Sequence, residues 1–279
     1  MKLKVLLFSQ RLDLKLPIYL SFLFAIASPI EPLFSENQNI YLLRGVAKAF
    51  GLPLANDWTV NQTDHLFLFT WLTEISYSIS PILFYIYHIS LSFILVYSLY
   101  TISKKLIKNK IDNHITVYFF LFLFIANQFL NILDGLAGQY ILGSYFQPSS
   151  FGVFLAASIA FFLFDKYFTA IICCLIAAYF HPTYILQAVF LTITYQLILL
   201  KKRNFRQALF IGAVALIGIS PLIYSLYYLF ADVPFEILKK SQEILVYDRI
   251  HHHAIFSSWA LTNHSLLGFT TLTGALVIF

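Results

Sequence analysis

The chain has 279 residues, of which 59% are hydrophobic, 18% aromatic and only 11% charged, whereas about 25% of the residues of a soluble domain are charged. This composition excludes a soluble globular protein. The many Phe and Tyr residues beside only 10 Gly, 9 Pro and 2 Cys exclude a disordered chain, a collagen-like repeat and a disulfide scaffold. The apolar runs are continuous and do not alternate, so the sequence predicts an all-α, polytopic transmembrane helical bundle.

Runs near the bilayer-spanning length of about 20 residues predict a single membrane domain with seven spans and the start of an eighth. The runs cover residues 16–30, 82–102, 115–132, 151–164, 168–180, 184–200, 208–230 and 266–279. The fourth and fifth runs are shorter than a full crossing. They are therefore either two spans or one hairpin that enters the membrane from one side.

The basic residues predict the orientation, because Lys and Arg collect in cytoplasmic loops. When alternate loops are assigned to the inside, 13 of the 18 basic residues but only three of the 13 acidic residues lie there. We therefore expect an integral membrane protein with a cytoplasmic amino terminus and with outer loops at 31–80 and 231–264. The net charge of +5 is explained by this asymmetry and indicates membrane lipid, not nucleic acid, as a partner. The first span, with its basic start and Ala25-Ile26-Ala27, also resembles a cleavable signal.

Ionisable groups are nearly absent from the predicted spans, which contain no Asp, Glu, Lys or Arg. His88 is the exception, and we expect a neutral imidazole that is hydrogen-bonded inside the bundle. Transporters driven by ions usually need charged groups within their spans. The polar chemistry of this chain is instead concentrated in the two outer loops, whose length is unusual for connections without a function.

The first outer loop contains the segment 39–50, whose apolar Ile40, Leu43, Val46 and Phe50 share one face of a helix. This spacing predicts an interfacial helix that lies on the membrane. A second apolar stretch follows at 66–79.

Two acids, Asp57 and Asp64, lie between these stretches. Asp64 directly precedes the second stretch, so it is either a functional acid or the cap of a helix. Asp57 is either a functional acid or a solvated loop residue.

The second outer loop opens with Asp232-Val233-Pro234, which is typical of a helix start, and continues to Arg249 and the triplet 251–253. An extended triplet would place His251 and His253 on one side. A helical triplet would place Arg249 one turn before the last two histidines. Either arrangement aims cationic or metal-binding nitrogens at one point, although a solvated polar turn is an open alternative.

Proline residues mark two further turns on the predicted outer side, at Gln147-Pro148 and His181-Pro182. Gln147 and His181 are either site residues or turn and capping residues.

Several of these segments together resemble a family of uncharacterised bacterial multi-spanning proteins that is grouped with the GT-C glycosyltransferase superfamily. The matching segments are Asn39-Ile40-Tyr41-Leu42-Leu43, Leu54-Ala55-Asn56-Asp57-Trp58 with Thr63-Asp64, Phe146-Gln147-Pro148, His181-Pro182-Thr183 and Arg249-Ile250-His251-His252-His253. The resemblance covers most of the chain, and each motif is short. It implies a GT-C-like fold and a polyprenyl-phosphate-linked sugar as donor.

The resemblance also implies residue roles. It assigns catalysis to Asp57, with Asp64 as a second acid, and substrate binding to Arg249, His251 and His253. Gln147 and His181 join the substrate-binding set. A divalent metal near the departing phosphate is one further option that the resemblance leaves open.

The chain departs from the family in two places. Where the family has a proline, a histidine and an aromatic residue after the arginine, this chain has Ile250 and three histidines. Related proteins continue through several more spans, whereas this chain stops at Phe279 inside an apolar run, so we expect a truncated piece.

Three functions are consistent with the sequence. The first is an inverting transfer of a sugar from a polyprenyl-phosphate carrier to a glycan or lipid acceptor of the cell envelope, on the non-cytoplasmic face. The second is a transporter or flippase of a lipid-linked solute. The third is a non-catalytic membrane partner with the same fold.

Overall fold

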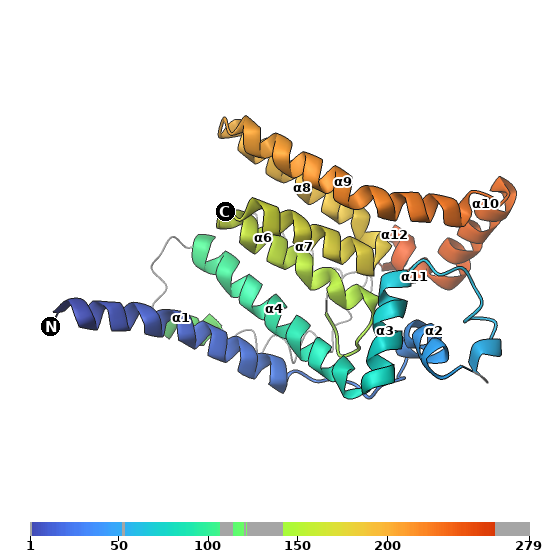
Figure 1. The fold of residues 1–279 in the computed structure, drawn as a ribbon, viewed down its shortest axis with the longest axis horizontal. Helices are drawn as coiled ribbons and strands as arrows, with labels where there is room; N and C mark the ends of the chain where they lie inside the picture. The colour runs from blue at the N-terminus through green and yellow to red at the C-terminus, as the bar shows by residue number, and fades with distance from the viewer. Residues whose placement is uncertain (1, 52–53, 107–113, 120, 122–141, 260–279) are drawn as a thin grey trace. The chain divides into compact units, whose positions relative to one another are not determined.

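The described residues of the computed structural model, 2–51, 54–106, 114–119, 121 and 142–259, form helices and no strands, which confirms the predicted all-α class (Figure 1). Most of the predicted span at 115–132 and all of that at 266–279 lie outside these residues. The chain divides into two compact units. The first unit comprises residues 1–122 and 141–226, and the second comprises residues 123–140 and 227–279.

Three helical segments are long and apolar enough to cross a membrane, and they match predicted spans. They are α4 (Ile82–Leu106), η3 (Pro182–Tyr184) continued by α8 (Ile185–Lys201), and α9 (Phe205–Phe230). Three shorter apolar segments match the remaining described runs: the last half of α1 (Lys2–Ala27), η2 (Pro148–Gly152) with α6 (Val153–Leu163), and α7 (Tyr167–Phe180). The described part of the chain is therefore all-helical, with three segments that have the length and hydropathy of membrane spans.

The fourth and fifth predicted runs form a helical hairpin in which α6 packs against α7. Asp165 makes the turn possible with a left-handed backbone at φ 59°, and the Tyr167 hydroxyl donates a 2.6 Å hydrogen bond to its Oδ1 atom. The Nζ atom of Lys105, near the end of α4, lies 5.0 Å from the centre of the Phe164 ring. This contact places the end of α4 beside the turn between α6 and α7.

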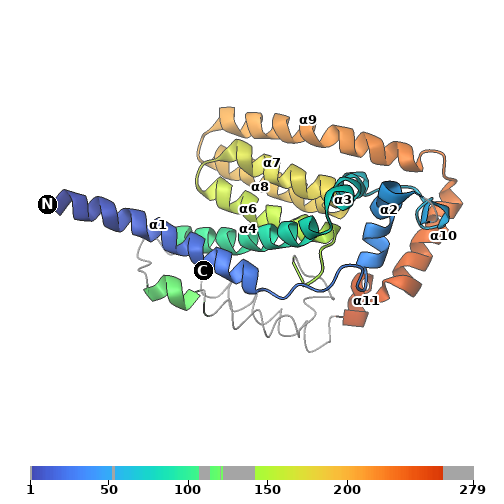
Figure 2. The ribbon, with the colours of Figure 1, turned by 60° about the horizontal axis from the view of Figure 1, so that its bottom comes forward.

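The opposite end of the first unit, where α1 ends and α4 begins, is called the polar end below. It holds α2 (Gln38–Phe50), the short turn η1 (Leu54–Asn56) and α3 (Phe67–Ile79). Figure 2 shows α2 and α3 next to each other, past the start of α4. Both helices lie where the sequence predicts them.

The apolar face predicted for α2 is only partly right. The helix buries Leu42, Gly45 and Val46, whereas Ile40 and Phe50 are 61% and 66% exposed. A Cβ atom on Gly45 would lie 2.5 Å from the Thr73 Cβ atom. Glycine therefore allows the backbones of α2 and α3 to approach closely. The buried face of α2 shares only Val46 with the apolar face that the sequence pattern assigned to the membrane.

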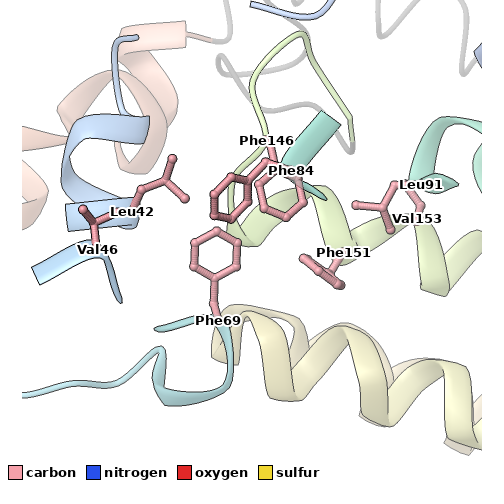
Figure 3. Packing of buried hydrophobic residues seen from close by; sticks show 8 residues of the cluster. All are labelled: Leu42, Val46, Phe69, Phe84, Leu91, Phe146, Phe151 and Val153. Carbon is pink, nitrogen blue, oxygen red and sulfur yellow. The ribbon is translucent and has the colours of Figure 1, made fainter. Parts of the chain in front are cut away.

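Aromatic rings build the core that fastens the polar end to the long helices (Figure 3). Phe69 of α3 lies within 6.3 Å, centroid to centroid, of both Phe146 and Phe151. Leu42 and Val46 of α2 contact the same cluster, which continues to Phe84 on α4 and Val153 on α6. Burying such side chains contributes roughly 1.5–3 kcal/mol each, so the loop helices are part of the folded core.

Two expectations about residues within the spans have different outcomes. Cys173 and Cys174 are buried packing residues, as expected. His88 is buried too, and its Nδ1 atom has no hydrogen-bond partner among the residues that the structure describes, so the expected hydrogen bond of this imidazole stays a prediction.

The part of the second unit that the structure describes after α9 forms four short helical segments. They are α10 (Phe235–Glu243), η4 (Ile244–Arg249) with π-helical turns, α11 (His251–Ala254) and α12 (Phe256–Trp259). The predicted helix start after Asp232-Val233-Pro234 is confirmed. Of the α10 and η4 side chains, all of which the structure describes, none is buried.

Candidate functional site

Arg44 on α2 is the centre of the polar contacts at the polar end. Its Nε atom donates to the Val60 carbonyl at 3.0 Å, and its Nη2 atom donates to the carbonyls of Thr59, at 3.2 Å, and Gln62. Its Nη1 atom lies 3.0 Å from Oδ1 of Asp64, with both side chains largely covered. A guanidinium group suits this task because its donors point in fixed directions. Arg44 thereby fixes residues 59–64 to α2.

Asp64 ties this loop to the start of α3. Besides the ion pair, its Oδ1 atom accepts hydrogen bonds from the Leu66 amide at 3.1 Å and from the Thr70 hydroxyl at 3.2 Å. The contact to Leu66 lies one residue before α3 begins, so Asp64 stabilises the helix start from just outside the helix. These contacts give Asp64 a structural role of the kind that the capping alternative describes.

Asp57 closes a local turn and projects into solvent. Its Oδ1 atom accepts a 2.8 Å hydrogen bond from the Thr59 amide and a second bond from the Thr59 hydroxyl. The pKa of Asp57 is lowered from its ordinary value, first by the Thr59 side chain and then by the Thr59 backbone. The carboxylate is therefore ionised at neutral pH, exposed, and held in one direction by a loop that Arg44 anchors.

Gln147 and His181 lie in neighbouring turns of the first unit. Gln147 is buried and caps η2. Its backbone N–H donates a 3.3 Å hydrogen bond to the Ser150 hydroxyl, and its side chain accepts a hydrogen bond from the Ser150 backbone N–H. The Tyr184 hydroxyl donates a 2.8 Å bond to the Ser149 carbonyl, which joins η3 to η2. Gln147 thus has the contacts of a capping residue.

His181 follows α7 in an extended conformation and pairs through Nδ1 with the Thr183 hydroxyl. Burial, followed by the nearby charge of His65, lowers the pKa of His181 to about 4. His181 is therefore a neutral imidazole at physiological pH. The rings of Phe67 and Tyr179, 6.5 Å apart, connect the start of α3 to the end of α7 beside it.

The first unit therefore brings together three of the predicted outer segments: the acidic loop, the turn at Gln147 and the turn at His181. Arg44, His65 and Tyr184 belong to this arrangement and were missed by the sequence analysis. One signal could have found Arg44, since it is one of only two basic residues in a loop assigned to the outside.

Arg249 and His251 belong to the second unit, so their predicted convergence with Asp57 stays a prediction. Both side chains are exposed. The triplet 251–253 is helical, but Ile250 has φ −125° and separates it from η4, so the continuous helix from Arg249 to the histidines is wrong. The side chain of His253 lies outside the described residues.

An apolar cavity of about 500 Å³ lies within the first unit between α7, α8 and α9. Its walls include Leu175, Ile193 and Leu216. The polar residues in its lining are engaged elsewhere: the Thr192 hydroxyl donates to the Ala188 carbonyl at 2.8 Å, and the Gln196 amide to the Ala208 carbonyl at 3.1 Å. The cavity therefore suits a hydrocarbon chain.

A divalent metal does not fit the donors that the structure describes. Nowhere among those residues do three His, Cys, Asp or Glu side chains gather closely enough to hold an ion. Comparisons with models of protein families, with curated proteins and with solved structures each gave no match to this chain.

Proposed function

We propose that the protein is a GT-C-like glycosyltransferase of the bacterial inner membrane. In this proposal, it transfers a sugar from a polyprenyl-phosphate carrier to an envelope glycan or lipid on the non-cytoplasmic face, where the polar end lies. The observation that carries the proposal is the exposed, ionised carboxylate of Asp57, which Thr59 orients on a loop fixed by Arg44. A carboxylate held in one direction is what positioning of a nucleophilic hydroxyl requires.

The proposed reaction is a single displacement. The acceptor hydroxyl donates a hydrogen bond to Asp57, its oxygen bonds to the sugar carbon, and the bond from that carbon to the phosphate oxygen breaks. The phosphate leaves with the electron pair, the hydroxyl proton passes to Asp57, and the sugar configuration inverts. Bidentate contact of Arg249 with the leaving phosphate stays a prediction of the sequence. His251 and His253 donate hydrogen bonds to the same group, and no step is assigned to a metal.

The remaining predicted site residues take different parts in this proposal. Asp64 is a positioning residue, because its contacts to Arg44 and to the start of α3 hold the loop that carries Asp57. Gln147 and His181 form the adjoining wall for the sugar. The apolar cavity between α7, α8 and α9 holds part of the prenyl chain.

The test is sugar transfer by the purified chain in vesicles that contain a polyprenyl-phosphate-linked sugar and a glycan acceptor. We expect Asp57→Asn to lower the rate at least about 100-fold, the range of a positioned acid or base, while insertion and folding are unchanged. Glu74→Gln removes a carboxylate from α3 and is the matched control, with full activity expected. Full activity of Asp57→Asn would refute the role of this carboxylate.

A second candidate is a transporter or flippase of a lipid-linked solute, which the apolar cavity favours. Its sign would be scrambling of the lipid-linked sugar across the vesicle membrane without a covalent product. Ile193→Trp, which would fill the cavity, should then stop scrambling, whereas Asp57→Asn should not.

A further inference from the structure

The helix α10 has two chemically distinct halves. At 100° per residue, its charged residues Glu236, Lys239, Lys240 and Glu243 fall on one half of the helix surface. Phe235, Ile237 and Leu238 fall on the other half together with uncharged Ser241 and Gln242. Most of the apolar half is open, since Phe235 is 74% and Ile237 59% exposed, whereas Leu238 is partly covered. The helix is continued by η4, which adds exposed Ile244, Leu245 and Tyr247.

The charges on α10 balance one another. Two acids and two lysines are spaced three or four residues apart, so each acid has a lysine within reach along the helix. The charged half is therefore neutral in sum, and it gives the helix no preference for an anionic partner. The occupant of the apolar half is then selected by hydrocarbon contact alone.

The chain itself fixes how far α10 can lie from the membrane. The spanning helix α9 ends at Phe230, and α10 begins at Phe235. The Cα atoms of Phe230 and Phe235 are five residue steps apart, so they can be separated by at most about 17 Å when the connection is fully extended. Near its end α9 carries exposed Tyr224, Tyr227 and Tyr228, and such tyrosines are typical of the headgroup layer. The first turn of α10 is consequently within reach of that layer.

We propose that α10 is an interfacial helix that lies in the headgroup layer and inserts Phe235, Ile237 and Leu238 among the acyl chains. The partner of this surface is the lipid bilayer, with no requirement for anionic lipid. The proposal goes beyond the proposed function, because it needs neither a sugar donor nor Asp57.

Spin labels on single cysteines test the proposal in the full chain, with Cys173 and Cys174 replaced by alanine, in phosphatidylcholine vesicles. Labels at Phe235 and Leu238 should collide mainly with oxygen, which concentrates in lipid. Labels at Glu236 and Lys240 should collide mainly with a water-soluble nickel complex. A label at Val189 on the spanning helix α8 provides the lipid reference, and one at Lys202 in the α8–α9 turn provides the water reference.

The expected result is an oxygen-to-nickel collision ratio several-fold higher on the apolar half than on the charged half, unchanged when phosphatidylglycerol is added. Labels on both halves that behave like the Lys202 label would place α10 in water and overturn the proposal. Apolar labels shielded from both reagents would also overturn it, because they would show that protein covers this surface. A ratio that rises steeply with phosphatidylglycerol would refute the neutral lipid preference.

Discussion

The two loop regions of this chain use amphipathic helices in opposite ways. In residues 31–80, α2 and α3 bury side chains against each other and against an aromatic core. In residues 231–259, α10 and η4, which the structure describes in full, bury none. Two residues of α2 cause this difference. Gly45 lets α2 and α3 touch, and Arg44 fixes the loop that connects them. The comparison teaches that an apolar helix face is buried only where the fold supplies a protein surface to cover it.

The largest expected effect comes from the core of the first region. Leu42→Ala should lower the free energy of unfolding by about 3 kcal/mol, because Leu42 is fully buried and truncation leaves a cavity. Denaturant unfolding in detergent, followed by circular dichroism, measures the change. Ile40→Ala on the exposed side of the same helix is the control. Equal effects of the two changes would refute the assignment of the buried face.

Loss of the Arg44 contacts should have the next largest effect. Arg44→Met leaves Asp64 without its cation and three loop carbonyls without a donor, so we expect local destabilisation of about 2 kcal/mol. Hydrogen exchange of the amides of residues 59–66 should then accelerate roughly 30-fold. Lys48→Met, on an exposed position of α2, should leave exchange unchanged. Protection that survives Arg44→Met would show that packing alone holds the loop.

The pH dependence of stability reports on the turn at His181. Its pKa is about 4 in the folded protein against an ordinary value of 6.5, so below pH 6.5 the unfolded chain takes up a proton that the folded chain does not. Stability should fall as the pH drops from 6.5 towards 4, by at most about 1.4 kcal/mol per pH unit. Unfolding of the wild type and of His181→Gln between pH 6.5 and 4 measures this loss of stability, and the part that His181 causes should be absent in the variant. His65→Asn should raise the pKa of His181 in the folded protein, so that the fall in stability stops at a higher pH than in the wild type. A pH profile shared by all three proteins would contradict the burial of His181.

The smallest effect is expected in the second region. Leu238→Ala on α10 should change stability in detergent by less than about 0.5 kcal/mol, because no part of this helix is buried against protein. The same measurement as for Leu42→Ala applies, and the two leucines form a matched pair. A loss as large as that for Leu42 would show that α10 packs against protein.

Much of the local structure follows from the sequence. The bounds of α2 and α3 and the start of α10 were predicted within a residue or two, because Gly51, the Ser80-Pro81 pair and Pro234 terminate or start helices through backbone geometry alone. The three long spans follow from hydropathy. The candidate site was harder to predict. The acids were identified by residue type, but the contacts that distinguish Asp64 from Asp57 come from Arg44 and Thr59, and composition gives no sign of either pairing.

The sequence by itself determined that this is a helical chain with membrane-spanning segments, because lipid leaves backbone groups no partner outside a helix and the apolar runs have the required length. Only the tertiary structure decided which face of α2 is buried and which acid is held by a cation. Those outcomes depend on contacts between residues far apart in the chain, such as Gly45 with Thr73 and Arg44 with Asp64. Helical periodicity describes one helix at a time, whereas burial depends on the neighbour that the fold supplies.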